Sequence, residues 1–133
     1  MTEPVWIQLA AVLQFHDRSI AEFGGVPGVR DPGAIESALD RPRNLLTYGD
    51  PDLFDLAAAY TAGLSQNHGF VDGNKRTAFV AGAVFLGVNG YRVEAEQAEV
   101  IAAMLSLAEH MIDEAGYARW LRDHAVLQVT PSH

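Results

Sequence analysis

The chain has 133 residues, 49% of them hydrophobic, so it is long enough for one core, and a single domain is the default expectation. Its formal net charge of -8 excludes a general nucleic-acid-binding protein, since neutralising phosphates requires a basic face. The absence of cysteine excludes disulfides, thiolate metal sites and cysteine nucleophiles, and is compatible with the cytoplasmic location that we expect.

The N-terminal residues predict an amphipathic helix that ends at Phe23. Thr2 is a candidate cap, Pro4 falls in the first turn, and apolar residues at helical spacing predict one buried stripe. Its members are Val5, Leu9, Val12, His16, Ile20 and Phe23. Residues 1–15 resemble a signal segment but lack a basic start, so we interpret them as part of a core helix. No apolar run approaches the roughly 20 residues that a membrane span requires.

A short second helix is predicted after a glycine-rich turn. Asp31 and Pro32 provide its cap and first position, and it is expected to end near Leu39. The following segment, residues 41–51, contains two prolines. Within it, Asn44–Tyr48 is predicted to be either an extended flap or an ordinary loop.

Two further helices are predicted on either side of a polar loop, defined as residues 68–77. Asp52 caps the first of them, whose apolar spacing continues to Asn67. The second begins near Asn74, ends at Asn89 and is apolar on nearly all sides. It is therefore predicted to be the central helix of the fold.

The C-terminal part predicts a short extended link, Gly90–Val93, followed by two amphipathic helices. The first, residues 95–107, would bury Ala98, Ile101, Ala102 and Leu105; the second follows the cap Asp113 and would bury Tyr117, Trp120 and Leu121. The predicted fold is an all-α compact bundle of about six helices with a short flap. We expect one domain over residues 1–126 and a disordered tail over residues 127–133.

The polar loop has the chemistry of an anion site, because the first N–H groups of a helix lack intrahelical partners. Gly73 allows a phosphate to approach the backbone closely. Lys75 and Arg76 oppose the helix dipole in the first turn, a cost that makes sense if a polyphosphate binds there. Asp72 could hold a magnesium ion beside these phosphates. His68 could accept a proton from a substrate hydroxyl.

A structural interpretation remains possible for each of these residues alone, with His68 as a helix C-terminal residue, Asp72 or Asn74 as a helix cap and the cations as a solvated first turn. Their combination within ten residues favours a functional site. The loop is not a P-loop, because its glycines are too close together and no strand precedes it. Three other histidines, His16, His110 and His124, lack the spacing of a zinc site, and we predict no metal there.

The stretch His68-Gly69-Phe70-Val71-Asp72-Gly73-Asn74-Lys75-Arg76 resembles the Fic/Doc signature, H-x-F-x-[DE]-[GA]-N-[GK]-R. Further segments are similar to the death-on-curing (Doc) toxin branch of that family. They are His16-Asp17, Phe23–Gly28, Asp31–Gly33, Asp52–Phe54 and Asn89-Gly90. The resemblance implies an all-helical bundle whose central helix follows the signature loop.

The resemblance also implies an ATP- and magnesium-dependent transferase. In this family, His68 would be the general base and Asp72 the magnesium ligand. The phosphate-binding end would be Gly73, Asn74, Lys75 and Arg76, with Lys75 and Arg76 also counted as catalytic. Lys75 replaces the glycine of AMP-transferring members, and Phe79 stands where many of those have a second arginine. Both departures are shared with the Doc branch and imply transfer of the terminal phosphate.

In the Doc branch, the resemblance implies a toxin of a type II toxin-antitoxin system that phosphorylates a threonine of elongation factor Tu and stops translation. AMP transfer is the alternative of the same fold, and a non-catalytic co-regulator of an antitoxin-repressor is the alternative of another class. Asn44–Tyr48 falls where the family carries its target-docking flap. The self-inhibitory motif of many members, Ser or Thr followed four residues later by Glu, is absent from the sequence. The resemblance therefore implies control by a separate antitoxin that inserts into an apolar groove, without direct nucleic-acid contact.

Overall fold

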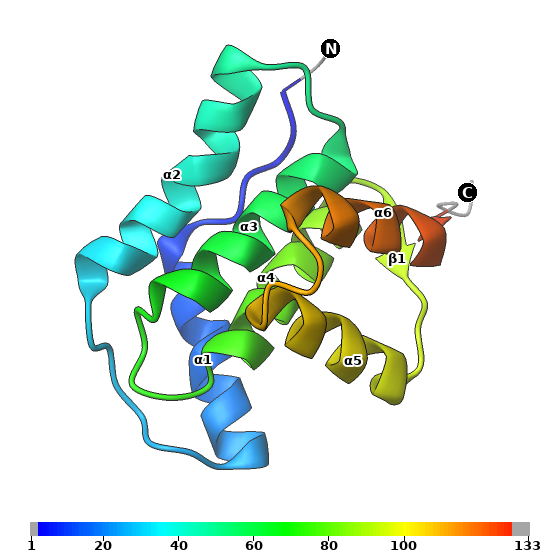
Figure 1. Cartoon of the computed structure of the whole chain (residues 1–133). Coiled ribbons are helices and arrows are strands. Elements are labelled where there is room, and N and C mark those ends of the chain that lie inside the picture. Colours follow the sequence, from blue (N-terminus) through cyan, green and yellow to red (C-terminus); the bar gives the residue numbers. More distant parts are fainter. Residues whose placement is uncertain (1–2, 129–133) are drawn as a thin grey trace, which may run out of the picture.

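The computed structural model describes residues 3–128, which form six helices and one two-stranded sheet. The elements are α1 (Leu9–Phe23), α2 (Pro32–Tyr48), α3 (Leu53–Asn67), α4 (Asn74–Val88), β1 (Tyr91–Val93), α5 (Gln97–Ala108), α6 (Glu114–His124) and β2 (Ala125–Leu127). Figure 1 shows α3 and α4 in the middle, with α1 and α2 on one side and α5 and α6 on the other. The predicted all-α bundle is therefore confirmed.

The most buried helix is α3. Asp52 caps it and forms a capping box with Asp55, as expected for a carboxylate at this position. Every residue from Leu56 to Ser65 is buried, because three consecutive alanines let α2, α4 and α6 approach from different sides. As predicted, α4 lies in the middle of the bundle, beside α3, but it leaves one face partly exposed, including Val88.

The contact between α3 and α4 depends on a glycine. A Cβ atom at Gly82 would lie 2.3 Å from Oγ1 of Thr61 and 3.0 Å from the carbonyl oxygen of Ala57. The Thr61 hydroxyl donates to the carbonyl oxygen of Ala78 at 2.9 Å, which satisfies a polar group buried between the helices. These contacts fix the relative position of the two helices that carry the polar loop.

The first helix is shorter than predicted because the chain from Glu3 to Gln8 is not helical. The Asn89 side chain pairs with both backbone groups of Val5, accepting from its N–H at 2.8 Å and donating to its carbonyl oxygen at 2.9 Å. The N–H of Ile7 donates to the Tyr60 hydroxyl at 3.1 Å. These tertiary hydrogen bonds replace those that a helix would have supplied.

The predicted stripe of the first helix is correct only in its middle. Val12 and His16 are buried, whereas Val5, Leu9 and Phe23 are largely exposed. At Val5 the helical spacing was extrapolated into an extended segment, where a helical period does not apply, whereas Leu9 and Phe23 are the first and last residues of α1. The predicted cap, Thr2, lies outside the described residues.

The second helix is longer than predicted. Asp31 caps it as expected, accepting from the N–H of Ala34 at 3.1 Å, but α2 then continues through Pro42 to Tyr48. The predicted end near Leu39 and the extended flap or loop at Asn44–Tyr48 were therefore wrong. Proline has no backbone N–H and so removes one helical hydrogen bond. Burial of the Pro42 side chain compensates for that loss.

The last two helices lie where the sequence predicted them, but α5 buries a different face from the predicted one. Asp113 caps α6 by accepting from the N–H of Gly116 at 2.7 Å, and Tyr117 and Leu121 are buried as predicted, with Trp120 half-buried. In α5, the buried residues are Ala103, Met104 and Leu107, and the face predicted to be buried, Ala98, Ile101, Ala102 and Leu105, is exposed. Because α5 is apolar all round, residue spacing could not identify its inner face.

Only one of the two strands of the small sheet was predicted. The extended link is confirmed as β1, which pairs antiparallel with β2 so that Tyr91 lies opposite Leu127 and Val93 opposite Ala125. Leu127 thus belongs to the sheet rather than to the predicted tail, and residues 129–133 of that tail lie outside the described residues. Among residues 3–128, none of the helices combines the length and apolar character needed to cross a bilayer.

Candidate active site

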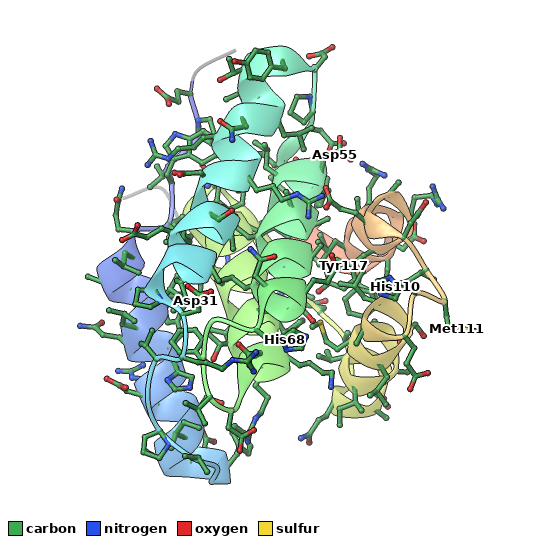
Figure 2. All side chains as sticks on the ribbon, turned by 60° about the vertical axis from the view of Figure 1, so that its left-hand side comes forward. Asp31, Asp55, His68, His110, Met111 and Tyr117 are labelled. Carbon is green, nitrogen blue, oxygen red and sulfur yellow. The ribbon has the colours of Figure 1, made fainter. Side chains whose placement is uncertain are left out.

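Two residues of the polar loop adopt the left-handed backbone conformation, one just after α3 and one just before α4. His68 follows α3 with φ 52° and ψ 46°, and Gly73 precedes α4 with φ 76° and ψ 17°. Glycine adopts this conformation without strain, whereas a histidine there carries a backbone cost of about 1–2 kcal/mol. The turn at His68 places its side chain at the surface, where Figure 2 shows it beside the loop.

The loop is anchored to the bundle by aromatic packing and by an amide side chain. Phe70 is buried, and its ring stacks on that of His16 with the centroids 3.9 Å apart. The Nε2 atom of His16 lies 2.8 Å from the carbonyl oxygen of Asp72, which only a ring N–H can satisfy. The Asn74 side chain accepts from the Phe70 N–H at 3.0 Å and donates to its carbonyl oxygen at 2.9 Å.

A second set of contacts ties the loop to the turn before α2. The N–H groups of Arg30 and Asp31 both donate to the carbonyl oxygen of Gly69, at 2.8 Å and 3.0 Å. No side chain fits at Gly69, since a Cβ atom there would lie 2.3 Å from Cγ1 of Ile35. The loop geometry is therefore set by contacts on both sides.

The Asp72 carboxylate lies at the surface beside the start of α4. Its oxygens accept from the N–H of Gly73 at 2.9 Å and from the N–H of Val26 at 3.2 Å. These hydrogen bonds, helped by the charge of Arg76, hold the pKa of the Asp72 carboxyl below its ordinary value. Gly25 lies so close that a Cβ atom there would be 2.8 Å from Oδ2 of Asp72.

We expect the contact between Asp72 and Val26 to depend on pH. Because the pKa is lowered from 3.8, the ionised carboxylate and its contact with Val26 persist to below pH 3.8 and are lost as the pH falls through the lower folded-state value. At neutral pH, Asp72→Ala should speed hydrogen exchange at the Val26 amide, measured by NMR. Asp40→Ala, at an exposed position on α2, should not, and equal exchange rates in the two variants would contradict the assignment.

The first turn of α4 carries the two cations that the sequence singled out. Within residues 3–128, no side chain caps this helix start, whose N-cap is Gly73, so the alternative in which Asp72 or Asn74 is the cap was wrong. The Arg76 guanidinium donates to the carbonyl oxygen of Gly24 at 3.1 Å and lies 5.1 Å from the centre of the Phe23 ring. Lys75 is exposed. The helix start thus presents free N–H groups and positive charge together.

The structure brings the predicted site residues together on one loop and adds others from far away in the sequence. His16, which we interpreted as a core histidine, is buried but also holds the loop in place. Gly24 and Val26, predicted as a turn and as part of a segment similar to the Doc branch, contact Arg76 and Asp72. The signal that could have found this turn is its density of glycines, which suits close backbone approach.

The described residues 3–128 contain no group of three or more His, Cys, Asp or Glu side chains able to enclose a metal ion.

Next to the loop, the Asn67 side chain donates to the carbonyl oxygen of Ala34 at 3.0 Å, which assigns Asn67 a structural role, while Gln66 is exposed.

Comparison with known proteins identifies the class of this bundle and loop. The model of the Fic/DOC family matches residues 6–86, which include α1 to α3, the polar loop and most of α4. The chain therefore belongs to the Fic/DOC family, as the signature predicted.

Two proteins similar to this chain are named as Doc proteins. The chain is 37% identical over 83 residues to Protein kinase doc of Escherichia phage P1, a match covering 62% of this chain and 66% of that protein. It is 45% identical over 76 residues to Toxin Doc of Mycolicibacterium smegmatis, covering 56% of this chain and 58% of that protein. The matched region is thus less than two thirds of each relative's own length.

Proposed function

We propose that this chain is a Doc-type toxin that transfers the terminal phosphate of ATP to a threonine or serine hydroxyl of elongation factor Tu, in the cytoplasm, and so blocks translation. The observation that carries the proposal is the rigidly held loop. It combines an exposed histidine, a carboxylate of lowered pKa and an uncapped cationic helix start. The name of the phage P1 relative, Protein kinase doc, supports phosphate transfer.

In the proposed mechanism, the free N–H groups at the start of α4, with Lys75 and Arg76, hold the phosphate oxygens. A ring nitrogen of His68 accepts the proton of the target hydroxyl. The hydroxyl oxygen then bonds to the terminal phosphorus as the bond to the bridging oxygen breaks, and ADP leaves with that electron pair. The exposed His68 returns its proton to solvent.

The loop also fits a magnesium ion. Asp72 offers one exposed, ionised carboxylate beside the proposed phosphate site, and a single protein ligand suits an ion that keeps its waters and shares the phosphates. When bound, magnesium would neutralise developing charge on the phosphates. The hydrogen bonds from Gly73 and Val26 would keep the carboxylate oriented for this role.

Phosphate transfer is preferred to AMP transfer because of Lys75. By the resemblance described above, AMP-transferring members have glycine there, and the lysine side chain takes up the room that their nucleotide phosphates use. Incubation of the protein with elongation factor Tu and ATP, followed by intact mass spectrometry, tests this choice. A phosphoryl adduct on the target is expected; an adenylyl adduct, or an unchanged mass, would contradict the proposal.

We further propose that an antitoxin segment binds in the apolar groove between α4 and β1. This groove has a volume of about 460 Å³ and is lined mainly by apolar side chains, including Phe79, Val84 and Tyr91. The absence of the family's self-inhibitory motif from this sequence supports control by a separate chain. In the same mass assay, antitoxin should suppress the adduct, and Val84→Asp should restore it. If the antitoxin suppressed the adduct equally for the wild-type chain and for Val84→Asp, it would bind outside this groove.

A further inference from the structure

The outer face of α5 is apolar although it faces solvent. Ala98, Ile101, Ala102 and Leu105 follow one another at spacings of three, one and three residues, which places them on one side of the helix. Ile101 is 51% and Leu105 is 44% exposed. The opposite side already packs into the bundle through Ala103, Met104 and Leu107. A surface helix normally carries polar residues on its outer face, so this second apolar face is suited to a partner.

The turn after α5 exposes a further large apolar side chain. His110 adopts φ 58°, and the next residue, Met111, is 75% exposed. Figure 2 shows Met111 at the outer edge of the molecule, well away from His68. The flexible thioether side chain of methionine adapts to varied partner surfaces, which suits a docking position.

The segment of the chain that carries this face is acidic. Residues 94–118 include neither Lys nor Arg but carry the acids Glu94, Glu96, Glu99, Glu109, Asp113 and Glu114. Within residues 3–128, Glu94, Glu99 and Glu114 are engaged by Arg92, His124 and Arg41, respectively. The exposed Glu96, Glu109 and Asp113 form no ion pair in that part of the chain. The apolar face thus has an acidic border.

The acidic residues around the apolar face indicate which kind of partner can bind to it. Pairing with a second copy would bring two acidic borders together, and an anionic membrane surface would be repelled in the same way. A segment with Lys or Arg beside its apolar residues would instead be attracted. Because α5 is twelve residues long and has alanines between its larger side chains, another helix can pack closely along it.

We propose that the outer face of α5, with Met111, is a docking surface for an amphipathic helix of a partner protein that carries basic residues along the edges of its apolar face. The surface shares no residue with the polar loop or with the lining of the groove between α4 and β1. It therefore adds a recruitment site that does not depend on the proposed transfer reaction.

The test uses the full chain and two labelled helical peptides with the same leucine stripe, one bordered by lysine and one by glutamate. Fluorescence anisotropy should show that the lysine-bordered peptide binds at least about tenfold more tightly, with affinity falling as salt is added. The double variant Ile101→Ser/Leu105→Ser should weaken its binding by at least about tenfold. The matched control Val5→Ser changes an exposed valine elsewhere and should have no effect.

Several outcomes would overturn the proposal. They are no binding of the lysine-bordered peptide at millimolar concentration, equal affinity for both peptides, and loss of binding in the control variant as well. Self-association in sedimentation that is abolished by Ile101→Ser/Leu105→Ser would identify a second copy as the occupant. Binding to anionic vesicles that the same variant abolishes would identify a membrane instead. Circular dichroism checks that each variant remains folded.

Discussion

Replacing His68 by asparagine should lower the rate of phosphate transfer by about a hundredfold to ten-thousandfold, the usual contribution of a general base. Asparagine tolerates the left-handed backbone that His68 adopts at φ 52°, so the turn after α3 should be retained while the proton acceptor is lost. The rate is measured as the gain in mass of elongation factor Tu with time. His68→Ala removes the same base but adds the backbone cost of alanine in this conformation.

His110 provides a matched control for this experiment. It is also an exposed histidine in the left-handed conformation, at φ 58°, but lies in the turn between α5 and α6. His110→Asn should therefore transfer phosphate at the wild-type rate. If His68→Asn were as active as His110→Asn, the assignment of the base would be wrong. If His68→Asn had no effect on growth arrest in cells, the non-catalytic co-regulator would become the better description.

Replacing Gly82 by alanine should lower the free energy of unfolding by about 1–3 kcal/mol, the usual cost of adding a methyl group to a tightly packed contact. The new Cβ atom would lie 2.3 Å from Oγ1 of Thr61 and 3.0 Å from the carbonyl oxygen of Ala57. Relief would require α3 and α4 to move apart or Thr61 to give up its hydrogen bond to Ala78. Urea denaturation followed by circular dichroism measures the change.

Gly87 is the control on the same helix. Among the residues that the structure describes, a Cβ atom there meets nothing within 4 Å, so Gly87→Ala should gain only the helix propensity of alanine. We expect it to raise the free energy of unfolding by about 0.5–1 kcal/mol. The changes in the free energy of unfolding need not be equal in size for the two variants. A Gly82→Ala protein as stable as Gly87→Ala would show that the contact between α3 and α4 relaxes without cost.

Helix boundaries that depend on local chemistry could be predicted from the sequence. Asp31, Asp52 and Asp113 were all identified as caps, and in each case the carboxylate accepts from a backbone N–H three residues later. The polar loop was likewise located between two helices because its residues interrupt two apolar segments. These features are set by residues close together in the chain.

Features set by tertiary contacts could not be predicted in this way. Pro42 indicated a helix end, yet its buried position allows α2 to continue. The extended residues before α1 depend on Asn89, which is 84 positions from Val5. In the candidate site, the signature itself was recognised, but the support from His16 and Val26 comes from residues 56 and 46 positions away from Asp72.

The polar loop connects α3 and α4, which lie next to each other in both sequence and space, and this has a consequence for the order of folding. Contacts between sequence neighbours have a low entropic cost of closure, so a helical hairpin of α3 and α4 can form early. The turn that supplies Gly24 and Val26 must then dock onto the loop between these two helices. We expect amides of α3 and α4 to gain protection first in pulse-labelling exchange, and the reactive geometry to be completed last, by the N-terminal part of the chain.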